Sequence, residues 1–292
     1  METRKLREMD PEIETKHSTA VEMAVQCIYR TIFPQGDQTF VATAFNWALS
    51  CFSGNYRDYG PIDAKYHDLE HTLQGTLCFC RMLHGRHVAG AQPALTQRMF
   101  ELGVLAILLH DTGYLKSRDD TEGTGAKYTM VHVNRSIDFS GILLEEKQLA
   151  PAEINAVQNM IRCTGVSVAI QSIPFENELE RQVGFCLGTA DLLGQMAAPD
   201  YVDKLPILYS EFEESAQYNA GRGSATGIFG SVRDLMVKTP LFWEGYVFPK
   251  VNGDFAGMYK FLNVPYPDGG NFYLRRIEAN IARVKAKLAE GE

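Results

Sequence analysis

The sequence predicts an all-α protein whose core bundle is followed by additional C-terminal helices. Apolar residues recur at intervals of three and four positions through most of the 292-residue chain, and the alternation typical of a half-buried strand is nearly absent. Hydrophobic residues make up 45% of the chain, which is enough to bury a sizeable core. We therefore expect a helical bundle rather than a fold based on a sheet.

The first two thirds of the chain contain the most regular helical patterns. A loop with the sequence SGNYRDYGPIDAK interrupts them, because its glycines and proline break any helical period. The expected helices run from Ser18 to the break at Pro34, from Thr39 to Cys51, from about Tyr66 to Leu83, from Leu95 to His110-Asp111, from Thr129 to Glu146, from Pro151 to Arg162 and from Glu178 to Met196.

The C-terminal region is less regular. From Pro206 to Leu262, helical pieces are interrupted by AGRGSATGIFG and by two further prolines. This glycine cluster lacks the GK[ST] ending of a phosphate-binding loop, so we interpret it as an ordinary loop. A final amphipathic stripe should dock on the domain, although a dimer seam is the alternative and a homodimer is possible; it comprises Leu274, Ile277, Ile281, Val284 and Leu288. We divide the chain into a polar arm (1–16), a helical domain carrying the motifs below (17–200) and a helical extension packed on it (201–292).

Charge and cysteine usage limit the classes of partner. The formal charge of −8 and a pI near 5.5 repel polyanions, and no lysine or arginine stripe offsets this, so nucleic acid is not expected as a partner. The six cysteines show no paired framework, the start of the chain is polar, and no apolar run approaches the roughly 20 residues of a membrane span. We expect a soluble, cytoplasmic protein without membrane association.

Four of the seven histidines lie in three short motifs, YHDLEH, HD and VHVNRS. His67 and His71 are four residues apart, so on one helix both would project from the same face. His110 and Asp111, at the expected end of a helix, can reach one ion. Asp191 interrupts the apolar face of FCLGTADLLGQM, and a buried aspartate is costly unless it is paired or bound to a metal. Two imidazoles and two carboxylates suit a divalent ion such as Zn, Mn, Fe or Mg, with positions left for water.

The ordered set of His71, His110-Asp111 and Asp191 resembles the H…HD…D signature of HD-domain metal-dependent phosphohydrolases. The nearer likeness is to cyclic-nucleotide phosphodiesterases, which place a histidine four residues before the first ligand in a YHN-type motif. The resemblance covers about residues 60 to 196. It implies an HD-domain helical bundle, metal ligation by His71, His110, Asp111 and Asp191, and a role for His67 as proton donor to the leaving oxygen.

The chain also departs from these enzymes. Asp68 stands where the phosphodiesterases have asparagine, and no match to their glutamine-bearing purine pocket is present. His132 fits the first of the further histidines found in two-metal HD proteins, so it is a candidate for a second shell or a second metal. Where another histidine often follows, the chain reads Ile161-Arg162-Cys163-Thr164. We therefore expect any second metal site to be weaker, using Asp111 and water.

These residues predict a phosphohydrolase that cleaves a phosphate ester of a small substrate, with nucleotides favoured. Metal-activated water would attack phosphorus while His67 protonates the leaving oxygen, and Asp111 would bind the metal and could bridge to a second ion. Lys116, in the loop DTGYLKSRDD, is a candidate contact for a phosphate oxygen, with a solvated loop lysine as the alternative. Two other functions stay open, an HD-type di-iron oxygenase and a non-catalytic ligand-binding regulatory protein.

Overall fold

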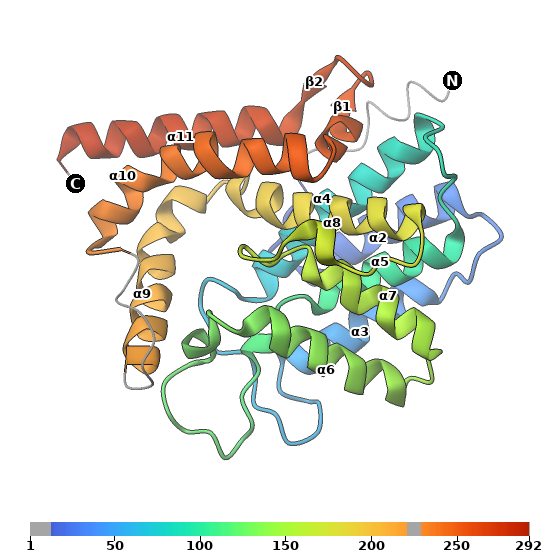
Figure 1. Cartoon of the computed structure of the whole chain (residues 1–292), viewed down its shortest axis with the longest axis horizontal. Helices are drawn as coiled ribbons and strands as arrows, with labels where there is room; N and C mark the ends of the chain where they lie inside the picture. Colours follow the sequence, from blue (N-terminus) through green and yellow to red (C-terminus); the bar gives the residue numbers. More distant parts are fainter. Residues whose placement is uncertain (1–12, 221–228, 292) are drawn as a thin grey trace.

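The computed structural model of the chain confirms the all-α prediction (Figure 1). It describes residues 13–220 and 229–291, so most of the expected polar arm and most of AGRGSATGIFG lie outside the described residues. The α-helices are α2 (Ser18–Ile32), α3 (Phe40–Phe52), α4 (Leu69–Val88), α5 (Gln97–Leu109), α6 (His132–Glu146), α7 (Pro151–Arg162), α8 (Glu178–Met196), α9 (Tyr201–Ala220), α10 (Val232–Phe242) and α11 (Phe272–Glu290). Short helical turns and one antiparallel pair, β1 (Asn263–Val264) with β2 (Gly270–Asn271), connect them.

Two helices, α4 and α8, pack against each other at the centre of the molecule. Every residue from 71 to 80 of α4 is buried, so this helix has neighbours on all sides. A glycine, Gly194, allows α8 to come close, because a Cβ at this position would lie only 2.9 Å from the backbone of Gln74. Side chains carried by these two helices therefore lie on the most rigid part of the fold.

The start of α4 differs from its expected position. Asp68 is the N-cap, and its side chain accepts a hydrogen bond of 2.9 Å from the backbone N–H of His71. This cap fixes the first helical residue at Leu69, so Tyr66 and His67 precede the helix. The expectation that His67 and His71 share one helical face is therefore wrong, because the expected helix ran through the capping residue.

The prolines of the C-terminal region do not end its helices. Helix α9 begins at Tyr201 and continues through Pro206, and α10 contains Pro240. The chain then continues through two π-helical turns, Trp243–Val247 and Lys250–Asp254. Pro249 lies between these two wider turns, which keep the chain helical at one of the expected breaks.

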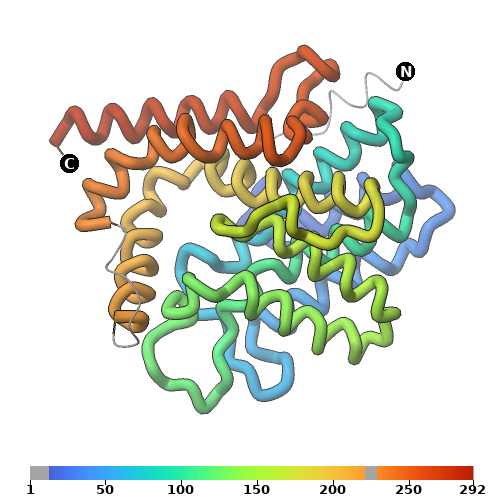
Figure 2. The backbone as a smooth tube through the Cα atoms, in the orientation of Figure 1, coloured from blue at the N-terminus to red at the C-terminus, as the bar shows by residue number. Residues whose placement is uncertain are grey.

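The C-terminal stripe docks on the bundle, as expected. Figure 2 shows α11 lying along α10, and it also packs against α8 and α9. Its residues Ile277, Ile281 and Val284 are buried. The side chain of Asn280 donates to the carbonyls of Met196 and Ala198, each at 2.8 Å. Helix α11 thus fixes the junction between α8 and α9.

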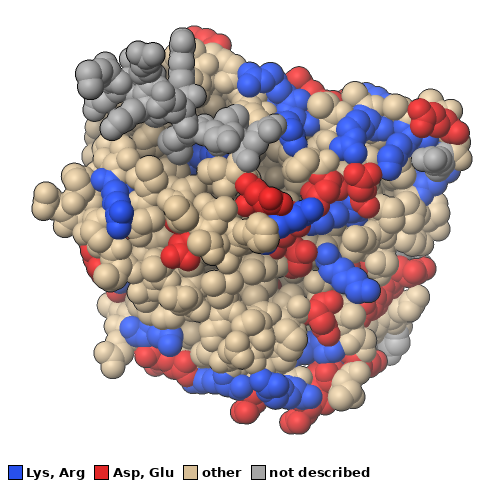
Figure 3. Space-filling view, turned by 180° about the vertical axis from the view of Figure 1, so that it is seen from behind, with Lys and Arg blue, Asp and Glu red and all other residues tan. Residues whose placement is uncertain are grey.

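The surface agrees with the mixed charge composition. On the face seen in Figure 3, acidic and basic side chains are interspersed. None of the described helices is both long enough and apolar enough to cross a membrane. All six cysteines are free thiols, and five of them are buried.

Candidate metal centre

The structure brings together the four side chains that the sequence predicts as metal ligands. The Nε2 atom of His71 lies 3.2 Å from Asp111 Oδ2 and 3.3 Å from Asp191 Oδ1. The Nε2 atom of His110 lies 3.2 Å and 3.4 Å from the same two oxygens. Three separate segments supply this cluster: the first turn of α4, the end of α5 and the middle of α8.

The spacing of these atoms fits a metal ion. Bonds of about 2.1 Å to one ion place adjacent ligand atoms about 3.0 Å apart in an octahedron and about 3.4 Å apart in a tetrahedron. The four nitrogen-to-oxygen distances of 3.2 to 3.4 Å fall on this range. His71, His110 and Asp191 also form the one group of metal-ligand type and spacing among the described residues. The cluster can therefore hold one divalent ion.

Unpaired polar atoms support the same fit. His110 Nε2 and Asp111 Oδ2 are fully buried and lie 3.2 Å apart, yet neither makes a hydrogen bond of good geometry. An unsatisfied buried polar group costs about 1–3 kcal/mol, and more when the group is charged. A metal bound between the two atoms would satisfy both.

Backbone contacts orient the imidazoles. The Nδ1 atom of His110 lies 2.7 Å from the carbonyl of Ile107, so Nδ1 carries a proton and Nε2 is the ring nitrogen that faces the cluster. Just after the ligand pair, Gly113 packs so tightly on the backbone of His132 that a Cβ would lie 1.9 Å from its carbonyl oxygen. Only glycine fits there, which links the HD segment closely to the start of α6.

The charges of the two imidazoles and the two carboxylates balance one another within the cluster. Burial alone would lower the pKa of His71, but the carboxylates of Asp111 and Asp191 outweigh this effect and raise it to about 9. Burial opposes ionisation of Asp191, yet the two imidazoles hold its pKa well below the ordinary value. Without a metal, protons on the imidazoles balance the carboxylates, so a metal must displace protons to bind.

His67 lies beside this cluster, and its imidazole ring is 5.3 Å from that of His71. Its partner is Glu211 of α9, whose Oε2 atom lies 2.6 Å from His67 Nδ1. The other oxygen of Glu211 accepts the backbone N–H of Tyr66 at 2.7 Å. Burial would raise the pKa of Glu211, but these hydrogen bonds keep it below the ordinary value, so Glu211 is a carboxylate. The sequence analysis did not identify Glu211, because no motif marks it on α9.

His132 lies at the edge of the cluster. Its Nδ1 atom lies 2.7 Å from the carbonyl of Thr129, and its Nε2 atom is 3.8 Å from Asp111 Oδ1. This oxygen is not the one that approaches His71 and His110. Asp111 therefore presents one oxygen to the four-ligand cluster and the other toward His132. Cys163 lies in the segment where two-metal HD proteins often have another histidine. It is buried at the end of α7 and contacts the Asn159 carbonyl.

Tyr114 also lies in this centre, and the sequence analysis did not select it. Its ring stacks on His67, with centroids 4.7 Å apart, and on His132, with centroids 4.8 Å apart. The side chain is fully buried, and its hydroxyl has no hydrogen-bond partner. Burial and the nearby carboxylates, Asp111 first among them, raise the pKa of Tyr114 well above the ordinary value, so the hydroxyl keeps its proton.

Two of the three donors of the Lys116 ammonium group have partners within the chain. The side chain is buried, its Nζ atom lies 3.3 Å from Asp63 Oδ2, and it donates to the carbonyl of Gly123. Arg135 is engaged as well, because it donates to the carbonyls of Gly113 and Leu115 at 2.7 and 2.6 Å. These two cations hold the loop that follows the HD pair.

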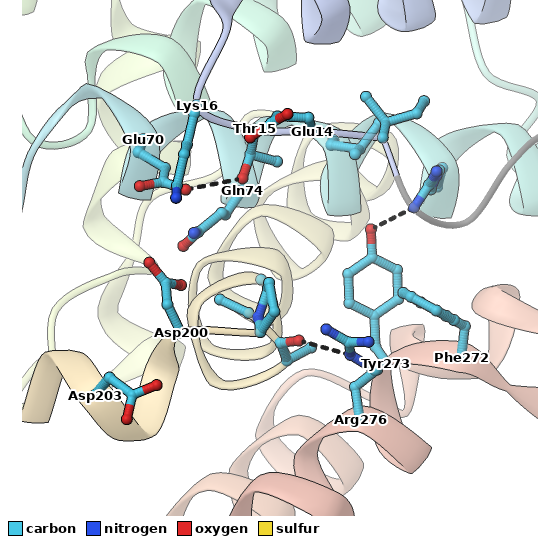
Figure 4. Close-up of a pocket in the computed structure, with 17 residues that line it drawn as sticks. Glu14, Thr15, Lys16, Glu70, Gln74, Asp200, Asp203, Phe272, Tyr273 and Arg276 are labelled. Carbon is cyan, nitrogen blue, oxygen red and sulfur yellow. Dashed lines mark hydrogen bonds between the residues drawn. The ribbon is translucent and has the colours of Figure 1, made fainter.

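A separate cavity of about 500 Å³ lies between α4, the junction of α8 and α9, the start of α11 and residues 13–16 (Figure 4). None of the four predicted metal ligands lines it. Its acidic wall is internally paired, because Lys204 binds Glu70 at 2.8 Å and Asp200 at 3.3 Å. Arg81 donates to the hydroxyl of Tyr273. This cavity is distinct from the metal centre.

The fold and the cluster together define an all-helical protein with a candidate centre for one divalent metal. The chain belongs to the Npun_R2479-like family, whose family model matches residues 40–285. No curated protein matches the chain. The matched range contains the four predicted metal ligands together with His67, Tyr114 and Glu211. The family model therefore covers the whole candidate centre as well as α9 and α10.

Proposed function

We propose that this protein is a metal-dependent phosphohydrolase that cleaves a phosphate ester of a small molecule, with nucleotides as the favoured class. The observation that supports this most directly is the pair of buried, unpartnered atoms, His110 Nε2 and Asp111 Oδ2, at metal-ligand spacing beside a histidine held by a carboxylate. The HD-type resemblance of the same residues gives the reaction class, and the placement of His67 gives the proton donor.

His71, His110, Asp111 and Asp191 would hold the ion. A divalent metal at such a site supplies a water activated for attack at neutral pH and neutralises charge on a phosphoryl group. The chain supplies the other functions. Its ligands come from three helical segments, so the position of the ion is set by the central packing of α4 and α8.

His67 is the proposed general acid. Glu211 accepts a hydrogen bond from its Nδ1 atom, which leaves Nε2 as the position from which a proton can pass to the leaving oxygen. Because Glu211 stays ionised, it can accept this hydrogen bond and hold the His67 ring in place. Glu211 is thus a positioning residue that acts through His67.

The test is metal analysis followed by an activity screen. The purified protein is analysed for metals, stripped with a chelator, and reconstituted with Mn²⁺, Zn²⁺, Fe²⁺ or Mg²⁺. Each form is assayed on phosphomonoesters, cyclic nucleotides, nucleoside triphosphates and a p-nitrophenyl phosphodiester. We expect about one ion per chain and metal-dependent release of product.

A matched pair of variants makes this screen specific. Asp111→Asn should lose metal and turnover, whereas Asp138→Asn, which changes an exposed aspartate on α6, should keep both. A protein that holds no metal, cannot be reconstituted and hydrolyses none of these esters would refute the proposed function. Stoichiometric metal with oxygen-dependent oxidation instead of hydrolysis would favour the di-iron alternative.

A further inference from the structure

The metal centre contains more acceptors than donors for a phosphoryl group. Asp111 and Asp191 bring carboxylate oxygens, whereas a bound phosphate ester brings negatively charged oxygens of its own, which need donors. The proton of His67 is required by the leaving oxygen in the proposed reaction. A non-bridging oxygen that does not face the metal therefore needs another donor.

The nearby basic side chains are already engaged in holding the loop that follows the HD pair. Lys116 is bound to Asp63 and to the carbonyl of Gly123, and Arg135 is bound to two backbone carbonyls of the HD loop. The hydroxyl of Tyr66 is also engaged, because it donates to Gln195 Oε1 at 2.9 Å. Lys116 has two sequence-based alternatives, a phosphate contact or a loop lysine, and its bonds to Asp63 and Gly123 leave the phosphate contact open.

Tyr114 has the required properties. It is fully buried, its hydroxyl has a proton but no hydrogen-bond partner, and its ring is clamped against His67 and His132. The nearby hydroxyl of Thr129 already donates to the carbonyl of Ala126 at 2.6 Å. The Thr129 hydroxyl lies beside the phenol but makes no well-directed hydrogen bond with it. A buried phenol that is held between two rings and makes no hydrogen bond of good geometry can turn its donor to a ligand at little cost.

We propose that the Tyr114 hydroxyl is a catalytic residue of this centre, which donates a hydrogen bond to a non-bridging oxygen of the substrate phosphoryl group. This inference rests on the proposed function and adds a specific contact to it. Charge grows on the phosphoryl oxygens and on the leaving oxygen as the ester bond breaks, so a fixed donor favours the transition state over the free substrate.

The experiment compares Tyr114→Phe with the wild type and with Tyr56→Phe. The first variant keeps the stacked ring and removes only the hydroxyl. The second removes a tyrosine hydroxyl that binds Glu146 at 2.7 Å, outside the metal centre. For each protein loaded with Mn²⁺, three quantities are measured: metal content, affinity for inorganic phosphate by calorimetry, and kcat/KM on the best ester from the screen.

We expect Tyr114→Phe to keep its metal, to bind phosphate about 10-fold more weakly and to lose about 10- to 100-fold in kcat/KM. Tyr56→Phe should match the wild type in all three measurements. Wild-type phosphate affinity and turnover in Tyr114→Phe would overturn the inference while the proposed function stands. Loss of metal in this variant would overturn it too, because the residue would then be structural. If the wild-type protein itself neither binds phosphate nor hydrolyses esters, the function and this inference fail together.

Discussion

Removing the metal should make the stability of this protein depend on pH between neutral and alkaline conditions. In the metal-free protein the pKa of His71 is raised from 6.5 to about 9, because Asp111 and Asp191 outweigh the cost of its burial. A raised pKa in the folded state contributes stability that is fully present below pH 6.5 and is lost as the pH rises through about 9. The lowered pKa of Asp191 acts at the other end, so its contribution is present above pH 3.8 and is lost on acidification. Metal-free protein should therefore be most stable between about pH 4 and 6.5.

The size of the alkaline effect follows from the His71 shift. The pKa of His71 rises from 6.5 to about 9. At about 1.4 kcal/mol per pKa unit, this shift contributes of the order of 3 kcal/mol to the free energy of unfolding. The imidazole is almost completely buried, with 5% of its side chain exposed, so solvent screening reduces this value little. For a chain of this size, the loss should lower the melting temperature by roughly 5–10 °C.

Thermal melts of chelator-treated and metal-loaded protein, recorded from pH 6 to pH 9.5, provide the assay. The metal-free curve should fall across this range, whereas the metal-loaded curve should stay level, because the ion replaces the protons that balance the carboxylates. His87→Gln, which changes an exposed histidine at the end of α4, should follow the wild type in both states. Parallel curves for metal-free and metal-loaded protein would refute this account of the cluster.

Four substitutions test the individual roles. His71→Ala should lose metal, whereas His67→Ala should retain it and lose about 10²- to 10⁴-fold in turnover on an alkoxide leaving group. The defect of His67→Ala should shrink on a p-nitrophenyl phosphodiester, whose leaving group needs no proton, and equal losses on both substrates would contradict the general acid assignment. Glu211→Gln should keep its metal and lose about 10- to 100-fold in activity, with the loss absent in a His67→Ala background. Asp111→Ala should abolish metal binding and turnover together, as elemental analysis beside the assay would show.

The sequence was sufficient to predict most of the helices and the four side chains that converge in the candidate centre. Apolar periodicity located α7 and α8 with their observed ends, because the apolar pattern of each helix stops where the helix itself stops. The ligands could be predicted because Asp191 breaks an apolar face, and burial of such a group requires a partner. The structure shows that His71, His110, Asp111 and Asp191 converge, and metal binding by them stays a prediction.

The remaining parts depend on contacts between distant segments. Glu211 lies 144 positions after His67, on a helix without a motif, so only the packing of α9 reveals their hydrogen bond. Tyr114 was overlooked because tyrosine is common in cores, and its missing partner becomes visible only when its surroundings are known. Lys116 is a candidate for a phosphate contact or a loop lysine from its sequence position alone, and only the structure shows its ion pair with Asp63 of a preceding loop. Local sequence patterns carry no information on such pairings.

The position of α9 has a consequence for the modularity of this protein. Besides Glu211, it carries Glu214, whose Oε2 atom accepts a hydrogen bond of 2.7 Å from Thr124 in the loop beyond the HD pair. A chain ending at residue 200 would keep all four metal ligands but would leave His67 and this loop without their partners on α9. The boundary at residue 200 therefore divides the sequence, but the two segments depend on each other through these hydrogen bonds. Exchanging C-terminal regions between family members should succeed only when the acidic residues of α9 and the loop they hold are transferred together.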